Sequence, residues 1–107
     1  MSPKAQRIAI AMSLGWDEES ARRGFETTVR EQDGYTYSQI STKLPDYLND
    51  LNACREFEIW LLENHPDLRA VYRRILIECV GSDGLYWMAT ASQRCEAFLK
   101  TIGKWKE

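Results

Sequence analysis

The side chains of this sequence best suited to acid–base or nucleophilic chemistry are one histidine and three cysteines. His65 has only Glu63 and Asp67 nearby in the sequence, and a catalytic histidine needs a nucleophile or a carboxylate to act with. A histidine before Pro66 also serves as a polar residue at the start of a helix. We therefore expect His65 to be a turn residue and the protein to be no enzyme.

The cysteines Cys54, Cys79 and Cys95 are odd in number, widely spaced and free of any Cys-x-x-Cys pair. Each falls on the apolar face of a predicted helix, where free cysteine usually behaves as a small buried hydrophobic residue. A structural zinc site needs about four ligands at short spacing, which one histidine and these cysteines do not provide. We therefore expect reduced, unreactive thiols, no metal centre and no cofactor.

The densest cluster of side-chain oxygens is Asp46, Asp50 and Asn52. A metal site there would need further carboxylates, and Asp33 and Asp83 are the conceivable donors. Helix capping explains the cluster without an ion, because such side chains accept hydrogen bonds from the free N–H groups that open a helix. Asp50 is the predicted cap, since the apolar helical pattern starts directly after it.

Arginine and tyrosine side chains provide the candidate binding surface. Paired guanidinium groups recognise phosphate or carboxylate groups, and tyrosines in turn-rich segments are typical of binding surfaces. The alternative interpretation is a solvated face, in which arginine stems cover apolar surface. Trp87 is predicted to pack in the core. The candidate residues are Arg22, Arg23, Tyr35, Tyr37, Arg55, Arg69, Arg73, Tyr86 and Arg94.

The composition is that of one ordinary soluble domain covering residues 1–107. The chain is 44% hydrophobic and 28% charged, with a formal net charge of −2. This charge gives no general attraction to nucleic acid or to an anionic membrane. The apolar run from Ile8 to Met12 is too short for a signal peptide, and no stretch approaches the ~20 apolar residues of a membrane span. We expect a cytoplasmic protein without nucleic acid or membrane partners.

Three helices with clear start and stop signals are predicted to position these residues. The first begins after Ser2 and ends before Gly15. The central helix begins after Asp50 and carries an apolar stripe at helical spacing. The last covers residues 89–102, and Gly103 provides its stop signal.

A fourth helix is predicted over residues 66–80, with a competing interpretation. The proline at its start suits the first helical position, and Leu68, Val71 and Ile75 lie on one helical stripe. The alternative is a strand over residues 75–80, because a short apolar run fits either structure. The helix is favoured, since the stripe extends beyond that run.

A β-hairpin is predicted for the region before the central helix. Residues 17–23 fit one helical turn ended by Gly24, after which apolar and polar residues alternate, as in a strand. A turn at residues 32–34 and a return strand over residues 35–40 complete the hairpin. The predicted fold class is therefore α+β: a small β-hairpin or sheet packed with three to four helices, with a helix-rich C-terminal half. An unpaired edge of the hairpin at residues 25–40 predicts a homodimer; a monomer with a charged edge is the alternative.

Three stretches of the sequence together carry a family resemblance. They are Leu14-Gly15-Trp16, then Leu44-Pro45-Asp46-Tyr47 with Asp50-Leu51-Asn52-Ala53, and Ala89 through Gly103, which contains Gln93-Arg94-Cys95-Glu96-Ala97-Phe98-Leu99. This combination resembles the phage ABA-sandwich domain family. The resemblance implies a layered α+β fold, an origin in a phage or prophage, and no catalytic residues, because the family has no established activity.

These observations favour a small accessory protein that acts by binding a host or phage macromolecule. The alternative function is a module that sequesters or senses a small anionic, nucleotide-like ligand between arginine and aromatic side chains. An enzyme is disfavoured, because the polar residues include no acid–base or nucleophilic set.

Overall fold

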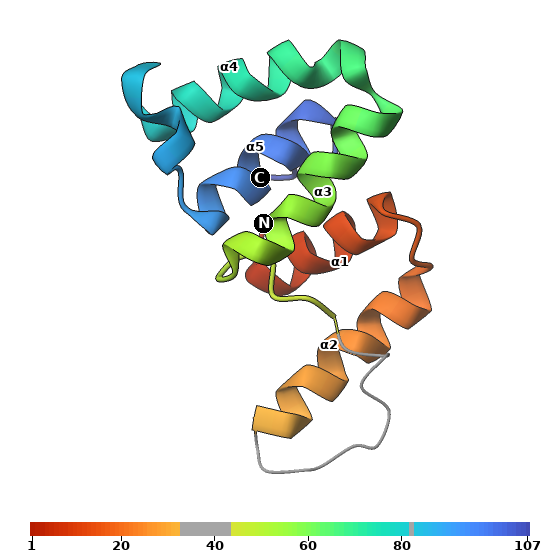
Figure 1. Cartoon of the computed structure of the whole chain (residues 1–107). Coiled ribbons are helices and arrows are strands. Elements are labelled where there is room, and N and C mark those ends of the chain that lie inside the picture. Colours follow the sequence, from red (N-terminus) through yellow and green to blue (C-terminus); the bar gives the residue numbers. More distant parts are fainter. Residues whose placement is uncertain (33–43, 82) are drawn as a thin grey trace.

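The computed structural model of the chain describes residues 1–32, 44–81 and 83–107, and every regular element in these ranges is a helix. In Figure 1, α4 and α5 lie toward one end of the molecule and α1 and α2 toward the other. The α-helices are α1 Pro3–Ser13, α2 Glu18–Gln32, α3 Leu51–Asn64, α4 Arg69–Val80 and α5 Ala91–Thr101. The short 3-10 helices η2 Pro66–Leu68 and η3 Asp83–Met88 precede and follow α4.

Helix α1 forms between the start and stop signals that the sequence predicts. The Ser2 hydroxyl accepts a hydrogen bond from the N–H of Ala5 at 3.1 Å, and Pro3 follows at the first helical position. Gly15 adopts a φ of +109°, a conformation that suits glycine. The chain then turns back, and the N–H of Trp16 donates to the carbonyl of Ala11 at 3.0 Å.

Helices α3 and α5 also begin at side-chain caps, of which the one at Asp50 is predicted from the sequence. Asp50 accepts a hydrogen bond from the N–H of Asn52 at 2.9 Å, which confirms its predicted role. Thr90 and Gln93 form a reciprocal capping box at the start of α5, with distances of 3.1 and 2.8 Å. Gly103, with a φ of +75°, follows the end of α5.

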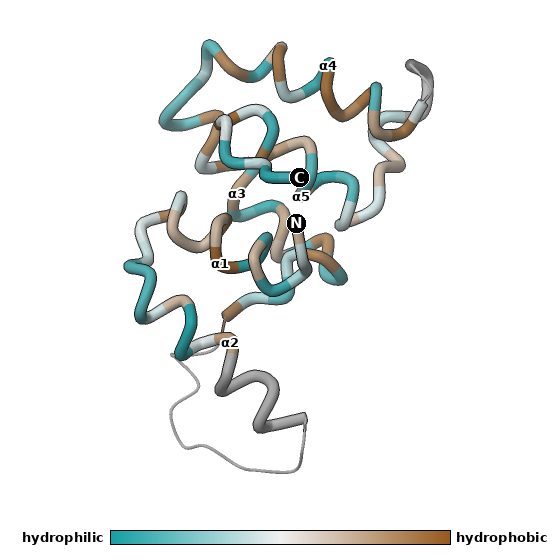
Figure 2. The backbone as a smooth tube through the Cα atoms, turned by 180° about the vertical axis from the view of Figure 1, so that it is seen from behind, coloured by the Kyte–Doolittle hydropathy of each residue, from teal (hydrophilic) through white to brown (hydrophobic). Residues whose placement is uncertain are grey.

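The helical interpretation of residues 66–80 is confirmed, and the competing strand is wrong. Pro66 opens η2, and α4 continues from it to Gly81, which ends the helix with a φ of +82°. Figure 2 shows hydrophobic and hydrophilic residues alternating along α4, as expected of a helix with one buried side.

The predicted hairpin is wrong in the part of it that the structure describes, because residues 25–32 continue α2. Asp17 accepts a hydrogen bond from the N–H of Ser20 at 2.7 Å and so starts this helix. Ala21 and Phe25, four residues apart, both contribute to a small core against α1. The first and last residues of a five-residue alternation are four apart, which is also helical spacing. The alternating pattern is therefore too short to distinguish a strand from a helix.

The α+β fold class and the layered sandwich implied by the family resemblance are therefore wrong. The described ranges contain helices and no strand. The return strand, with Tyr35 and Tyr37, lies outside the described residues. Residues 25–32, half of the hairpin whose edge predicts the homodimer, form no strand, and the homodimer stays a prediction.

Two clusters of buried side chains hold the helices together. The larger one packs α3, α4 and α5 around Phe57 and Phe98, whose rings stack with centroids 4.6 Å apart. The smaller one joins α1, α2 and the segment that leads into α3, through Ile8, Ala21 and Leu44. Helices α3 and α4 each pack on α5. The short helix η2 connects α3 to α4, and the two helices diverge from this connection (Figure 1).

Candidate binding groove

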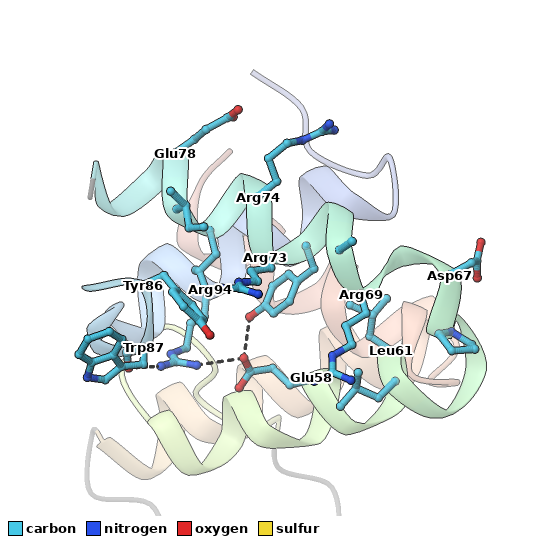
Figure 3. A pocket seen from close by; sticks show the side chains of 16 residues that line it. Glu58, Leu61, Asp67, Arg69, Arg73, Arg74, Glu78, Tyr86, Trp87 and Arg94 are labelled. Atoms are coloured by element: carbon cyan, nitrogen blue, oxygen red, sulfur yellow. Dashed lines mark hydrogen bonds and ion pairs between the residues drawn. The ribbon is translucent and has the colours of Figure 1, made fainter. Parts of the chain in front are cut away.

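A groove opens where α3 and α4 diverge, and we call it the α3–α4 groove. Its volume is about 890 Å³, within the roughly 300–1,000 Å³ typical of ligand sites. Leu61, Tyr72 and Leu76, all buried, provide apolar lining, and η3 contributes Tyr86 and Trp87 (Figure 3). The groove therefore combines side chains from α3, α4, η3 and the start of α5.

One hydrogen-bonded cluster ties these elements together inside the groove. The Tyr72 hydroxyl donates to Glu58 Oε2 at 2.7 Å, and Arg94 Nη1 donates to the same oxygen at 3.0 Å. Arg94 also donates to the carbonyls of Ala89 at 3.1 Å and Trp87 at 2.8 Å. Figure 3 shows this cluster linking α3, α4 and the η3–α5 connection.

The electrostatics of the cluster keep the Tyr72 hydroxyl as a donor to Glu58. Burial raises the pKa of Tyr72 far above its ordinary value, and the adjacent Glu58 carboxylate raises it further. The Tyr72 hydroxyl therefore stays protonated and acts as a donor. The Arg94 guanidinium pairs with Glu58 while both side chains are about one-fifth exposed, at 17% and 22%. The charges of Glu58 and Arg94 thus compensate each other.

Three further arginines of α4 line the groove, and their side chains are differently engaged. Arg73 lies over the Tyr86 ring, 4.8 Å from Cζ to the ring centroid. The side chains of Arg69 and Arg74 make no hydrogen bond or ion pair with any residue that the structure describes. Figure 3 shows Arg69 reaching across the groove and Arg74 pointing away from it.

Large apolar side chains border the groove and face solvent. Leu62 on α3 is 46% exposed, and Trp87 and Met88 of η3 are 60% and 66% exposed. The Trp87 ring meets Tyr86 edge-on, with ring centroids 6.0 Å apart. The prediction that Trp87 packs in the core is wrong, because the short η3 turn carries its ring outward.

The structure brings together four of the nine predicted binding residues: Arg69, Arg73, Tyr86 and Arg94 line the groove. Arg55 is exposed on α3 but does not line the groove. Arg22 and Arg23 are exposed on α2, where they form ion pairs with Glu18 and Glu19, one helical turn earlier. Tyr35 and Tyr37 lie outside the described residues.

Sequence reasoning missed Glu58, Tyr72 and Arg7 as residues with a specific polar role. A glutamate inside the apolar run Phe57-Glu58-Ile59-Trp60 was the available signal for the first, since a half-buried charge needs a partner. Tyr72 gave no such signal, because it lies on the apolar stripe. Arg7 is 8% exposed and donates to the carbonyls of Leu44 at 2.7 Å and Pro45 at 3.2 Å.

The cysteine thiols lie away from the groove opening. Cys54 and Cys95 are fully buried and both donate to the carbonyl of Tyr47, at 3.0 and 3.2 Å. The Cys54 thiol and burial together raise the pKa of Cys95 well above its usual range. Burial and a hydrogen bond to Glu96 raise the pKa of Cys79 to about 11. The raised pKa values keep the Cys79 and Cys95 thiols protonated at neutral pH, and protonated thiols are poor nucleophiles.

The remaining candidates for chemistry have structural contacts. The exposed His65 follows the last residue of α3 and meets the Trp60 ring edge-on, with centroids 5.2 Å apart. Asp46 accepts hydrogen bonds from Asn49 at 3.2 Å, while Asp50 caps α3. Across the described ranges, His, Cys, Asp and Glu side chains form no group of three that could hold a metal ion.

No helix in the described part of the chain is both long enough and apolar enough to cross a membrane. Comparisons of the chain with models of known protein families, with curated proteins and with solved structures found no match.

Proposed function

We propose that this chain is a small, non-catalytic accessory protein that binds another protein through the α3–α4 groove. The observation that carries the proposal is the groove itself: an apolar lining that includes the exposed Leu62 and Trp87, with the exposed Met88 next to Trp87 in the chain. Exposed apolar side chains gathered at one site are typical of protein-binding surfaces, and tryptophan is enriched among the residues that dominate binding energy.

The chemistry of the groove supports binding over catalysis. A general base needs a carboxylate or imidazole that can accept a proton from a substrate. Glu58, the carboxylate nearest the groove centre, already accepts hydrogen bonds from Tyr72 and Arg94. Its oxygen therefore stabilises the packing of three helices. A phage or prophage origin and a cytoplasmic location, both expected from the sequence, stay predictions.

Affinity capture with matched variants tests this proposal. The tagged chain is incubated with bacterial lysate, with and without phage infection, and the retained proteins are identified by mass spectrometry. We expect Trp87→Ala combined with Leu62→Lys to lose proteins that the wild type retains. Met12→Ser is the control, because Met12 is also an exposed apolar residue, at 44%, but lies on α1 away from the groove.

A circular dichroism melt of each variant first establishes that it folds as the wild type does. If the groove variant and the control retain the same proteins as the wild type, the groove is not the binding surface and the proposal is wrong.

A second candidate function is the binding of a small anionic ligand. It is favoured by the position of Arg73 against the Tyr86 ring, since a guanidinium beside an aromatic face suits a phosphate carried on a flat ring. Native mass spectrometry of freshly purified protein tests it. A bound small mass that is absent from an Arg69→Gln, Arg73→Gln variant would favour this function.

A further inference from the structure

The charged side chains around the α3–α4 groove do not balance locally. Glu58 is compensated by Arg94, and Figure 3 shows Asp67 and Glu78 pointing away from the labelled residues at the groove centre. Arg69 and Arg73 remain, without an ion pair to any described residue. The groove is therefore a locally basic site on a chain whose formal net charge is −2.

The spacing of these two guanidinium groups defines what they can recognise together. Residues four apart lie on the same side of an α-helix, with Cβ atoms roughly 5–6 Å apart. Arg69 and Arg73 are four residues apart on α4. Carboxylates separated by one turn of a second helix have the same spacing, so both ion pairs can form along one interface.

The elements that border the groove also favour one backbone conformation in a segment that binds there. An extended peptide gains much of its affinity from main-chain hydrogen bonds to the edge of a sheet. The described residues around the groove belong to helices, whose backbone groups are largely bonded within the helix. An occupant that satisfies its own backbone groups is therefore favoured, and an amphipathic helix does so.

We infer that the α3–α4 groove receives an acidic amphipathic helix of another protein, with its carboxylates on Arg69 and Arg73 and its apolar face toward Leu62, Tyr72 and Trp87. This inference rests on the proposed function and names the chemistry of the partner. Helix α4 has 12 residues and is about 18 Å long, so an occupant of about three turns matches its length.

Two libraries of displayed helical peptides, each about 12 residues long, test the inference. Both vary the apolar positions among Leu, Ile, Phe and Met; the polar positions are rich in Glu in one library and hold Gln in the other. We expect the wild-type chain to select binders from the Glu library at least about tenfold tighter than any from the Gln library, because a hydrogen bond between a guanidinium and a carboxylate is stronger than one between a guanidinium and a neutral amide.

Charge-matched variants identify the residues responsible. Arg69→Gln with Arg73→Gln should weaken the selected Glu peptides at least about tenfold. Arg55→Gln with Lys104→Gln removes the same charge from exposed positions outside the groove and should leave their affinity unchanged. All four side chains are exposed, so loss of folding is not expected, and thermal melts check this.

Several results would overturn the inference. These are equal affinity for Gln peptides, no effect of Arg69→Gln with Arg73→Gln, an absence of binders from the Glu library, or stronger competition by single-stranded DNA or inorganic phosphate than by the Glu peptides. Gln peptides that bind wild type and lose affinity with Leu62→Lys would overturn the acidic partner while supporting protein binding in the groove. The lysate capture decides the proposed function separately.

Discussion

The two buried clusters of the molecule differ in what fills them. The cluster around α5 contains large rings, with Tyr47 and Phe57 centroids 6.0 Å apart and Phe57 stacked on Phe98. The cluster between α1 and α2 relies on smaller residues such as Ala11 and Ala21, which bury less apolar surface each. Stability should therefore come mainly from the part of the molecule that carries the groove.

Each part of the molecule also has a polar contact that joins its elements: the Glu58–Tyr72–Arg94 cluster in the groove, and Arg7 at the smaller cluster. At the junction of the smaller cluster, Arg7 is a nearly buried charge whose guanidinium bonds to backbone carbonyls and lies 5.1 Å from the Phe25 ring centroid. This contact joins α1, α2 and the segment before α3. The position of α2 therefore depends on a small apolar core and on the contacts of one arginine. The groove rests on a larger apolar core and on the Glu58–Tyr72–Arg94 cluster.

The largest expected effect tests the difference in apolar packing between the two buried clusters. Phe98→Ala should lower the free energy of unfolding by about 3–5 kcal/mol, because Phe98 is fully buried and its ring contacts Phe57 and Trp60. Leu44→Ala in the smaller cluster should cost about 2 kcal/mol, at the low end for a buried leucine. Urea denaturation followed by circular dichroism measures both. An equal or larger cost for Leu44→Ala would contradict the difference between the clusters.

The second effect tests the hydrogen bonds of Arg7 at the smaller cluster. Arg7→Met keeps an unbranched apolar stem but leaves the carbonyls of Leu44 and Pro45 without these donors. We expect a loss of about 1–3 kcal/mol in the free energy of unfolding, since buried acceptors would lose their partners. Lys4→Met is the matched control: Lys4 is exposed and also lies near the Phe25 ring, at 5.4 Å, but makes no side-chain hydrogen bond with a described residue.

The same comparison explains how far the sequence predicted the fold. Helices α1, α3, α4 and α5 were predicted because each has a local start or stop signal, such as Asp50 or Gly81, that acts within a few residues. Helix α2 is predicted from the sequence as a turn and a strand, because Gly24 interrupts its helical pattern and the residues after Gly24 alternate between apolar and polar. The packing of Ala21 and Phe25 against α1 is a tertiary contact that no local pattern specifies.

The candidate site was only partly predictable for a related reason. Arg69 and Arg73 were recognised as one polar side of a helix, which is a local pattern. The groove itself arises from the divergence of α3 and α4 on α5, and the Glu58–Tyr72–Arg94 cluster joins residues from three helices. Neither feature has a periodic signature, so both needed the tertiary structure.

A smaller effect tests the local signals. Asp50→Ala should lower the free energy of unfolding by about 0.5–2 kcal/mol, because the N–H of Asn52 loses the Asp50 side chain as its hydrogen-bond acceptor. Asp50→Ser, which keeps a capping oxygen, should restore most of the loss. Peptide binding in the groove should not change in either variant. An unchanged melting temperature for Asp50→Ala would show that the cap does not contribute to stability.

The smallest effect concerns the thiol of Cys79, which joins α4 to α5 beside the larger cluster by donating to Glu96 at 3.1 Å. Burial, with the hydrogen bond to Glu96, raises the pKa of this thiol from 9.0 to about 11. Below pH 9.0 the thiol is protonated in the folded and the unfolded chain, so its contribution to stability is fully present.

Between pH 9 and 11 the unfolded chain loses this proton first, so that contribution is lost as the pH rises through the window. We therefore expect the difference in free energy of unfolding between wild type and Cys79→Ala to shrink across it, as measured by urea denaturation at several pH values. Asp50→Ala is the control, because it changes no thiol and its difference from wild type should stay constant. If the difference in free energy of unfolding between wild type and Cys79→Ala grows with pH, the folded state favours the thiolate. A thiolate cannot donate to Glu96, so the predicted hydrogen bond between α4 and α5 would then be wrong.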